Sequence, residues 1–300
     1  MTTALSALQG VLPPLTTPFA AAGSVDLAAL AANVEKYNRT ALAGYVVLGS
    51  TGEVVYLREE EKFKVWETVR ASAAREKFLI AGTGCEATAE TITLTRRAAD
   101  LGYQAALVRT PSYFKAQMTE AAWERHFGEV ADASPIPVLL YSVPQFTGLA
   151  MEAPLVARLA AHPNIFGIKD SSGNVQRVAE MLRLVPPDFQ VWVGSATTLY
   201  PSLCLGARGG ILAVACVLPE LCTELHQAYR RGDHARARTL QQRLLEATVA
   251  VTSGYGIAGL KFAMELRGYA GGLPRAPLQP LDAKAKAELT RVLRAVSASG

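Results

Sequence analysis

The chain has 300 residues, half of them hydrophobic, and a formal net charge of only +4. That length and composition allow a large core, built as two ordinary domains or as one α/β barrel with an extension. Because the charge is small and the basic residues are spread along the chain, nothing indicates a nucleic-acid partner. A small anionic molecule is the most that such a charge favours.

The sequence also argues against a membrane or metal protein. No segment reaches the roughly 18 uninterrupted apolar residues of a membrane span, and residues 1–5 lack the basic start of a secretory leader. The four cysteines and four histidines show no metal-ligand spacing. We therefore expect a cytoplasmic protein in a reducing compartment, without a membrane segment and without a metal.

Short runs of Val, Ile, Leu and Ala recur along the chain, each followed by a stretch long enough for a helix. These runs are residues 10–12, 44–48, 78–81, 105–108, 138–141, 165–169, 190–193 and 210–214. Their near-continuous apolarity is typical of parallel strands buried on both faces, and eight such units predict a (β/α)₈ barrel. A doubly wound sheet is the alternative. However, Pro13–Pro18 follows the first run in place of a Gly-rich dinucleotide turn.

Helix signals separate the runs, and the rhythm changes near Arg231. Asp26, Thr88 and Thr119 stand where helices should begin. After Arg231 the pattern predicts helices alone, at about residues 234–252, 257–266 and 282–296. We expect the barrel over residues 1–230 and a C-terminal helical extension over residues 231–300.

The sixth run, Ile165–Lys169, ends in a lysine and turns at once into a small polar loop, Asp170–Asn174. In mostly apolar surroundings the charged amine is disfavoured and the neutral nucleophile becomes accessible. Lys169 shares one strand face with Gly167, which we expect to leave room beside the amine. Lys169 is therefore a candidate Schiff-base lysine. The alternative is a strand-end lysine that reaches solvent or pairs with a carboxylate.

In such barrels the reactive residues gather at the carboxyl ends of the strands. Applied here, that rule collects one amine, two phenols and several hydroxyls: Thr16, Thr17, Ser50, Thr51, Thr83, Thr110, Ser112, Tyr113, Tyr141, Lys169 and Ser195. The set favours amine catalysis, and it offers no histidine or paired carboxylates for a metal-dependent class II aldolase. Tyr141 has an alternative role as a core aromatic residue. The loop 49–53 has one as a plain turn, although its backbone N–H groups would suit a carboxylate.

Three segments, Gly49–Glu53, Tyr141–Gly148 and Gly167–Asp170, look like the signature segments of a known family. The chain resembles the dihydrodipicolinate synthase and N-acetylneuraminate lyase family of class I, pyruvate-dependent aldolases, from about Gln9 to Val296. The resemblance implies a lyase that takes pyruvate or another 2-oxo acid and needs neither a metal nor an organic cofactor.

The resemblance also implies roles for individual residues. Lys169 would form the Schiff base, Tyr141 would shuttle protons, and the hydroxyls of Ser50 and Thr51 would hold the pyruvyl carboxylate. Tyr113 matches a tyrosine that enters the site of a neighbouring subunit, which implies a homotetramer built from dimers. Tyr113 and Thr51 are therefore further catalytic candidates. The further substrate-binding candidates are Ser171, Gly194 and Ile211, the last through its backbone.

The second substrate is predicted from where the chain departs from the family. Synthases that condense pyruvate with aspartate semialdehyde carry an arginine where this chain has Phe146, and a phenyl ring cannot replace a bidentate guanidinium. Segments 81–88, 141–144, 169–171, 268–272 and 275–279 look most like 4-hydroxy-2-oxoglutarate aldolase, although that enzyme has an asparagine in place of Thr51. We predict cleavage of 4-hydroxy-2-oxoglutarate to pyruvate and glyoxylate. The alternative is the 4-hydroxy-tetrahydrodipicolinate (dihydrodipicolinate) synthase reaction, with Arg109 as the replacement for the missing arginine.

A third possibility belongs to another functional class. A barrel that binds a 2-oxo acid as a sensor or scaffold would show the same fold and the same carboxylate loop. It would have no need of both Lys169 and Tyr141.

Overall fold

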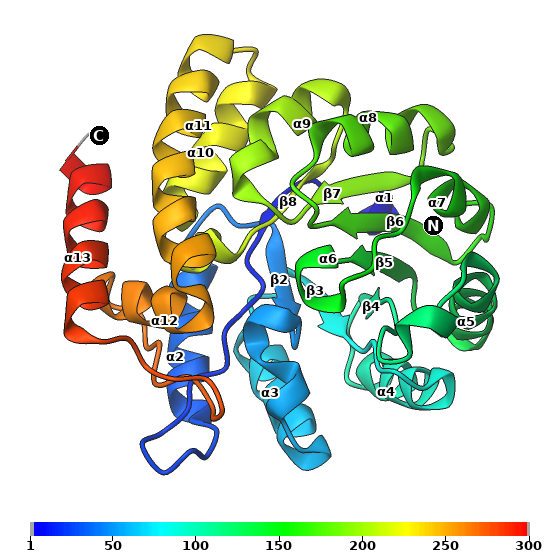
Figure 1. The fold of residues 1–300 in the computed structure, drawn as a ribbon, viewed down its shortest axis with the longest axis horizontal. Helices are drawn as coiled ribbons and strands as arrows, with labels where there is room; N and C mark the ends of the chain where they lie inside the picture. The colour runs from blue at the N-terminus through cyan, green and yellow to red at the C-terminus, as the bar shows by residue number, and fades with distance from the viewer. Residues whose placement is uncertain (1–2, 299–300) are drawn as a thin grey trace. The chain divides into compact units, whose positions relative to one another are not determined.

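The computed structural model describes residues 3–298, so residues 1–2 of the opening segment and residues 299–300 of the predicted extension lie outside it. Its strands are β1 (Gly10–Leu12), β2 (Gly44–Val47), β3 (Phe78–Gly82), β4 (Ala105–Arg109), β5 (Val138–Ser142), β6 (Ile165–Asp170), β7 (Gln190–Val193) and β8 (Gly209–Ile211). They form one eight-stranded sheet in the order β1-β8-β7-β6-β5-β4-β3-β2, and the pairs from β3–β4 to β7–β8 are parallel (Figure 1). This confirms the predicted (β/α)₈ barrel over the doubly wound sheet.

Helices follow the strands along the chain. The α-helices are α1 (Thr3–Ser6), α2 (Leu27–Asn38), α3 (Glu59–Ser72), α4 (Thr88–Asp100), α5 (Glu120–Ala133), α6 (Pro144–Thr147), α7 (Ala153–Leu159), α8 (Val175–Leu184), α9 (Leu199–Leu205), α10 (Pro219–Arg230), α11 (His234–Thr248), α12 (Gly256–Leu266) and α13 (Ala283–Ala298). Short 3₁₀ turns add η1 (Ser50–Gly52), η2 (Val54–Tyr56), η3 (Lys115–Gln117), η4 (Ala196–Thr198) and η5 (Ala213–Cys216), and η6 (Val249–Gly254) is a π-helix. Over the described residues, no helix combines the length and the apolar character needed to cross a membrane.

The chain divides into two compact units, residues 1–10 with 78–211 and residues 11–77 with 212–300. In the first unit, α4, α5, α7, α8 and α9 flank the outer side of strands β3–β8 (Figure 1). Buried polar contacts hold the N-terminal end of β7. There, the Gln190 side chain donates to the Leu5 carbonyl at 2.7 Å and accepts from Trp192 Nε1 at 3.1 Å. The division at residue 230 into barrel and extension stays a prediction.

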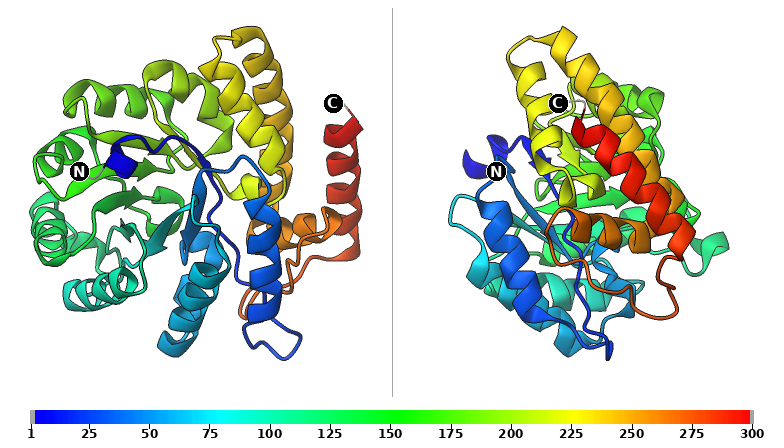
Figure 2. Two further views of the ribbon diagram at one scale, coloured as in Figure 1. Left: turned by 180° about the vertical axis from the view of Figure 1, so that it is seen from behind. Right: turned by 90° about the vertical axis from the view of Figure 1, so that its left-hand side faces the viewer.

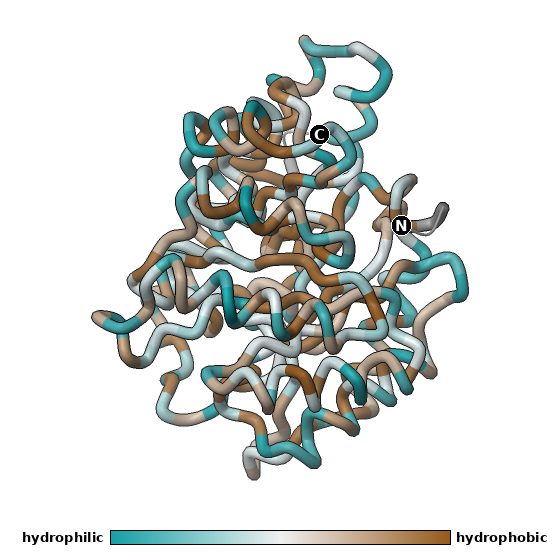
Figure 3. The backbone as a smooth tube through the Cα atoms, turned by 90° about the vertical axis from the view of Figure 1, so that its right-hand side faces the viewer, coloured by the Kyte–Doolittle hydropathy of each residue, from teal (hydrophilic) through white to brown (hydrophobic). Residues whose placement is uncertain are grey.

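The second unit is held by caps and aromatic contacts. Asp26 caps α2 by accepting from the Ala29 N–H at 2.9 Å, as the sequence predicted. Tyr37 on α2 donates from its hydroxyl to the Cys216 carbonyl at 2.6 Å, and its ring stacks on Tyr269 with centroids 4.5 Å apart. Figure 2 shows α10 and α11 side by side, and Figure 3 shows hydrophobic stretches inside and hydrophilic ones on the outer loops.

Predicted boundaries shift by one to four residues, and three of the shifts have a clear local cause. The eighth strand ends at Ile211 and not at 214, because the Ala215 N–H turns back to the Leu212 carbonyl and begins η5. The second strand ends at Val47, since Leu48 has a positive φ of 63°. The helix predicted to reach residue 252 is α-helical only to Thr248. Beyond it, the Thr252 hydroxyl donates to the Thr248 carbonyl within the π-helix η6.

Candidate active site

Lys169 and Tyr141 are buried side by side at the ends of neighbouring strands. Lys169 on β6 is in register with Tyr141 on β5, and each residue is 4% exposed. The Lys169 Nζ lies 4.3 Å from the centroid of the Tyr141 ring, within the range of a cation–π contact. Among residues 3–298, no carboxylate lies within ion-pair distance of Lys169. The amine therefore lies on an aromatic face, without the solvent or the carboxylate partner that the alternative required.

The adjacent carboxylate belongs to the opposite strand face. Asp170 follows Lys169 directly, so its side chain projects to the other side of β6. It is buried, and its Oδ2 accepts from the backbone N–H of Ser172 at 3.3 Å and from the Ser172 hydroxyl. Burial raises the pKa of Asp170, and the hydrogen bonds from Ser172 oppose that rise. Asp170 is thus held by its own loop and does not serve as a counter-ion for Lys169.

The structure brings together Ser171 and Gly194, which the sequence selected separately. Gly194 follows β7, and its N–H donates to the Asp170 carbonyl at 2.7 Å. A Cβ at Gly194 would stand 1.8 Å from the Ser171 Oγ, so only glycine leaves that hydroxyl its place. Ile211 is buried at the end of β8 in the same unit.

The structure gives Gly167 a different role from the predicted one. A Cβ there would stand 2.3 Å from the Gln190 carbonyl oxygen on β7. The glycine is therefore required by the close approach of the next strand. The room beside the amine that we expected from it has no support.

The second unit contains the hydroxyl pair Ser50 and Thr51. They open the 3₁₀ turn η1 directly after β2, with Thr51 buried and Ser50 half-buried. The Thr17 hydroxyl donates to the Gly52 carbonyl at 2.7 Å, and the Glu53 N–H donates to the Ser50 carbonyl at 3.0 Å. The turn that carries the two hydroxyls is therefore fixed at both ends.

Glu53 closes this turn in a left-handed conformation, with φ 55°, and its carboxylate is buried. The Lys261 Nζ on α12 lies 2.5 Å from Glu53 Oε1, and the Arg275 backbone N–H donates to Oε2 at 2.8 Å. Lys261 is 1% exposed, donates to the Leu273 carbonyl at 2.8 Å and lies 4.3 Å from the centroid of the Phe19 ring. Burial lowers the pKa of Lys261, and the Glu53 carboxylate opposes the shift.

Arg275 extends the same set of contacts. Its guanidinium forms a bidentate pair with Glu61, both N···O distances being 2.6 Å, and also donates to the carbonyls of Tyr56 and Gly23. We call Glu53, Glu61, Lys261 and Arg275 the ion network. Sequence reasoning missed its two cations. A single lysine in the mostly apolar segment 256–266 was the signal that would have revealed Lys261.

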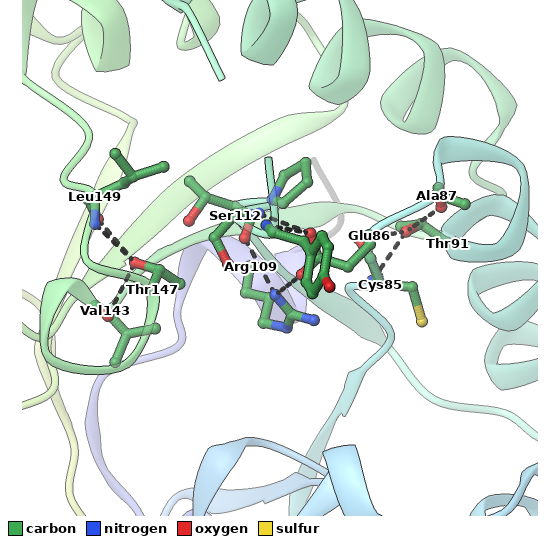
Figure 4. Close-up of polar contacts among 12 residues, drawn as sticks. Cys85, Glu86, Ala87, Thr91, Arg109, Ser112, Val143, Thr147 and Leu149 are labelled. Carbon is green, nitrogen blue, oxygen red and sulfur yellow. Dashed lines mark hydrogen bonds and ion pairs between the residues drawn. The ribbon is translucent and has the colours of Figure 1, made fainter. Parts of the chain in front are cut away.

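Tyr113 stands on a loop that is tied down by Glu86. The tyrosine is 78% exposed, and its ring meets Phe114 edge to face at 5.1 Å. Glu86 Oε2 accepts from the backbone N–H groups of Ser112 at 2.7 Å and Tyr113 at 2.9 Å (Figure 4). Burial acts to raise the pKa of Glu86, but these two bonds and the charge of Arg109 outweigh it and lower the pKa.

The two residues that bear on the second substrate differ sharply. Phe146 on α6 is 71% exposed and offers no hydrogen-bond donor from its side chain. Arg109 ends β4 in register with Tyr141, and its Nη1 donates to Glu86 Oε1 at 2.7 Å and to the Thr110 carbonyl at 3.3 Å. A guanidinium is therefore present at the strand ends, on β4 and not in the loop after β5 where the family pattern has it.

The dihydrodipicolinate synthetase family matches residues 7–296 of this chain. The chain belongs to this family. It is 37% identical to a 4-hydroxy-tetrahydrodipicolinate synthase of Exiguobacterium sp. over 284 residues, covering 93% of this chain and 95% of that protein. It is 38% identical to a synthase of the same name from Methanothrix thermoacetophila over 290 residues, covering 96% and 97%.

Solved structures of the dihydrodipicolinate synthetase family share the fold. A prophage protein of the dihydrodipicolinic acid synthase family from E. coli K12, in complex with pyruvate, is 31% identical with a TM-score of 0.91, covering 97% of this chain and 99% of that one. The dihydrodipicolinate synthase of Aquifex aeolicus is 31% identical with a TM-score of 0.92, covering 97% and 98%. The predicted family is confirmed, and with it an enzyme of the pyruvate-dependent lyase class.

The comparisons do not support the reaction that we predicted first. The relatives carry the name of the alternative, 4-hydroxy-tetrahydrodipicolinate synthase, and not that of a 4-hydroxy-2-oxoglutarate aldolase. In the part of the chain that the structure describes, no three His, Cys, Asp or Glu side chains gather as metal ligands would. That no metal or organic cofactor is needed remains a prediction.

Proposed function

We propose that the protein is a lyase that binds pyruvate as a Schiff base on Lys169. The observation that carries this proposal is the buried amine, which lies over the Tyr141 ring and has no carboxylate partner among the described residues. Schiff-base lysines are found without a carboxylate partner, whereas an ion-paired lysine is held as a cation. Membership in a family with pyruvate-bound relatives supports the same substrate.

The chemistry follows in balanced steps. The neutral Nζ attacks the C2 carbonyl of pyruvate, the carbinolamine loses water, and the resulting iminium gives up a C3 proton to become an enamine. The enamine carbon attacks an aldehyde, and water then hydrolyses the iminium and frees Lys169. Cleavage of a 4-hydroxy-2-oxo acid is the reverse of the same bond-forming step.

Roles for the other residues follow from the chemistry that each step needs. Tyr141, beside the amine, transfers protons during carbinolamine dehydration and C–C bond formation. Thr51 and Tyr113 are the further catalytic residues that the family pattern implies. Ser50, Thr51 and Ser171 supply hydroxyls for the pyruvyl carboxylate, while Gly194 and the backbone of Ile211 line the pocket. These assignments are supported by the family pattern and by the burial of Lys169, Tyr141 and Thr51.

For the second substrate, the first candidate is aspartate semialdehyde, since the relatives are named for that synthase reaction. The second candidate is 4-hydroxy-2-oxoglutarate, cleaved to pyruvate and glyoxylate. The exposed, apolar Phe146 favours it, because the family's arginine is missing there. A side-by-side measurement of kcat/KM for both reactions on one preparation decides between them. A tenfold advantage for either corresponds to about 1.4 kcal/mol of transition-state binding.

The Schiff base is tested by borohydride reduction in the presence of pyruvate, followed by mass measurement of peptides. We expect one reduced adduct, on Lys169, and none in Lys169→Ala. An adduct that persists in Lys169→Ala would overturn the assignment. An adduct on Lys169 without turnover of any aldehyde or 4-hydroxy-2-oxo acid would favour the non-catalytic 2-oxo acid binder. Exhaustive chelation is expected to leave turnover intact.

We further propose the homotetramer, built from dimers, that the resemblance implied. The exposed aromatic pair Tyr113 and Phe114 supports it, because leaving two aromatic rings of one loop in water is unfavourable, and such patches often mark protein interfaces. Sedimentation of the wild type and of Tyr113→Ser tests it. A wild type that sediments as a monomer would remove Tyr113 from the proposed catalytic residues.

A further inference from the structure

We propose that Arg109 binds the carboxylate of the second substrate, in place of the arginine that is missing at position 146. The inference rests on the proposed function, because it requires an enamine on Lys169 that reacts with a carboxylate-bearing aldehyde. Both candidate aldehydes, aspartate semialdehyde and glyoxylate, carry such a group.

The position of Arg109 fits that role. Arg109 is in register with Tyr141, and Tyr141 is in register with Lys169. Neighbouring strands lie about 4.8 Å apart, so two spacings place the Arg109 Cα roughly 10 Å from the Lys169 Cα on the same row of the sheet. Residues in register on parallel strands project to the same face. A substrate bound covalently to Lys169 would extend along that row toward the guanidinium.

The hydrogen bonds of Arg109 leave it with capacity for a ligand. Among the described residues, Glu86 and the Thr110 carbonyl engage Nη1 alone, although a guanidinium has five N–H donors. Nε is enclosed without a partner, and Nη2 has none among residues 3–298. The side chain is 19% exposed, and Figure 4 shows its remaining nitrogens pointing away from Ser112.

Glu86 does not occupy the remaining N–H donors of Arg109. Its Oε1 takes one bond from Arg109, while its Oε2 is committed to the two backbone N–H groups of the Tyr113 loop. His126 on α5 interacts with the charges of Glu86 and Arg109. Burial lowers the pKa of His126 to about 4, so its side chain is neutral at working pH and is not a competing cation. Arg109 is therefore a cation available for a second carboxylate at the end of β4.

The experiment compares charged and uncharged aldehydes in Arg109→Met and Arg109→Lys. For the wild type, glyoxylate and aspartate semialdehyde are compared with propionaldehyde in condensation with pyruvate. We expect Arg109→Met to raise KM for the charged aldehydes by about ten- to a hundredfold, with propionaldehyde and the KM of pyruvate changed by less than about threefold. Arg109→Lys is expected to recover part of the loss, since it keeps the charge and loses the bidentate geometry.

Two controls separate the proposal from a structural role. Arg125→Met removes an exposed arginine paired with Glu129 on α5, and it should change none of these constants. Glu86→Gln weakens the tie on the Tyr113 loop but keeps Arg109. If Glu86→Gln reproduces the Arg109→Met pattern, or if charged and uncharged aldehydes lose equally, Arg109 acts through the loop and the proposal is wrong. Failure of borohydride trapping in wild type would instead overturn the Schiff base itself.

Discussion

Two groups of buried charges differ in how they are satisfied, and the difference separates reactive from structural residues. In the ion network, Lys261 has a carboxylate at 2.5 Å and a carbonyl at 2.8 Å, and Arg275 has a bidentate carboxylate. At the strand ends, Lys169 has an aromatic face and no carboxylate partner among residues 3–298. Both lysines lie 4.3 Å from an aromatic centroid, so the ring does not distinguish them.

What distinguishes the two lysines is the counter-ion. A buried cation with a carboxylate partner is costly to deprotonate, and removing either partner leaves an uncompensated buried charge. A buried amine without such a partner can exist in the neutral form that attacks a carbonyl. The ion network also holds the turn after β2, so its structural charges support the hydroxyl pair Ser50 and Thr51.

The largest expected effect comes from Lys169→Ala. Because the covalent step is lost, we expect turnover to fall by at least about four orders of magnitude, while Tm changes by only a few degrees. Lys169→Arg should be equally inactive, since guanidinium is never neutral at working pH. Steady-state kinetics and thermal unfolding of the same samples check this. A Lys169→Ala protein that unfolds at much lower temperature would show that Lys169 is structural like Lys261.

Tyr141→Phe tests the ring and the hydroxyl separately. The phenyl ring keeps the aromatic face beneath the amine, so pyruvate trapping should persist in a folded protein. Turnover should fall by roughly two to four orders of magnitude, the usual range for loss of a positioned proton donor and acceptor. Single-turnover kinetics with borohydride quenching measure both quantities. Near-normal turnover would show that Tyr141 is a core aromatic residue and not a proton shuttle.

The ion network should give the opposite pattern. Lys261→Met leaves Glu53 buried with its charge uncompensated, and we expect a loss of about 3–5 kcal/mol in the free energy of unfolding. The double variant Lys261→Met with Glu53→Gln should be less destabilised than Lys261→Met alone, because it leaves no unpaired carboxylate at position 53. Denaturant unfolding measures both. Folded Lys261→Met should still trap pyruvate on Lys169, and a loss of trapping at full folding would place Lys261 in the chemistry.

The smallest effect concerns pH. The hydrogen bonds from Arg275 lower the pKa of Glu61 to about 2, from an ordinary value of 4.5. A lowered folded-state pKa stabilises the fold above about pH 4.5, and this contribution disappears as the pH falls toward 2. We expect Arg275→Met to lower Tm by a few degrees at pH 7, with the difference shrinking below pH 4. A difference that is constant with pH would assign the loss to packing against Phe19.

The sequence predicted the barrel because eight apolar runs separated by helix signals form a local pattern, and such patterns directly indicate secondary structure. It was less accurate at boundaries that depend on turns, as at Ile211 and Thr248. There, the chain passes into the 3₁₀ turn η5 and the π-helix η6, which the residue pattern does not reveal. It also did not reveal that the approach of β7 requires glycine at position 167, because this is a contact between segments over 20 residues apart.

The sequence by itself determined the family, the parallel β-α units and the identity of Lys169 and Tyr141 as candidates, since these depend on residue type and spacing along the chain. Only the tertiary structure decided which buried cations have partners. Lys261 and Glu53 are 208 positions apart, and Arg275 and Glu61 are 214 apart, so no sequence pattern links them. Ion pairing depends on distances of a few ångströms between side chains, and the fold alone sets those distances.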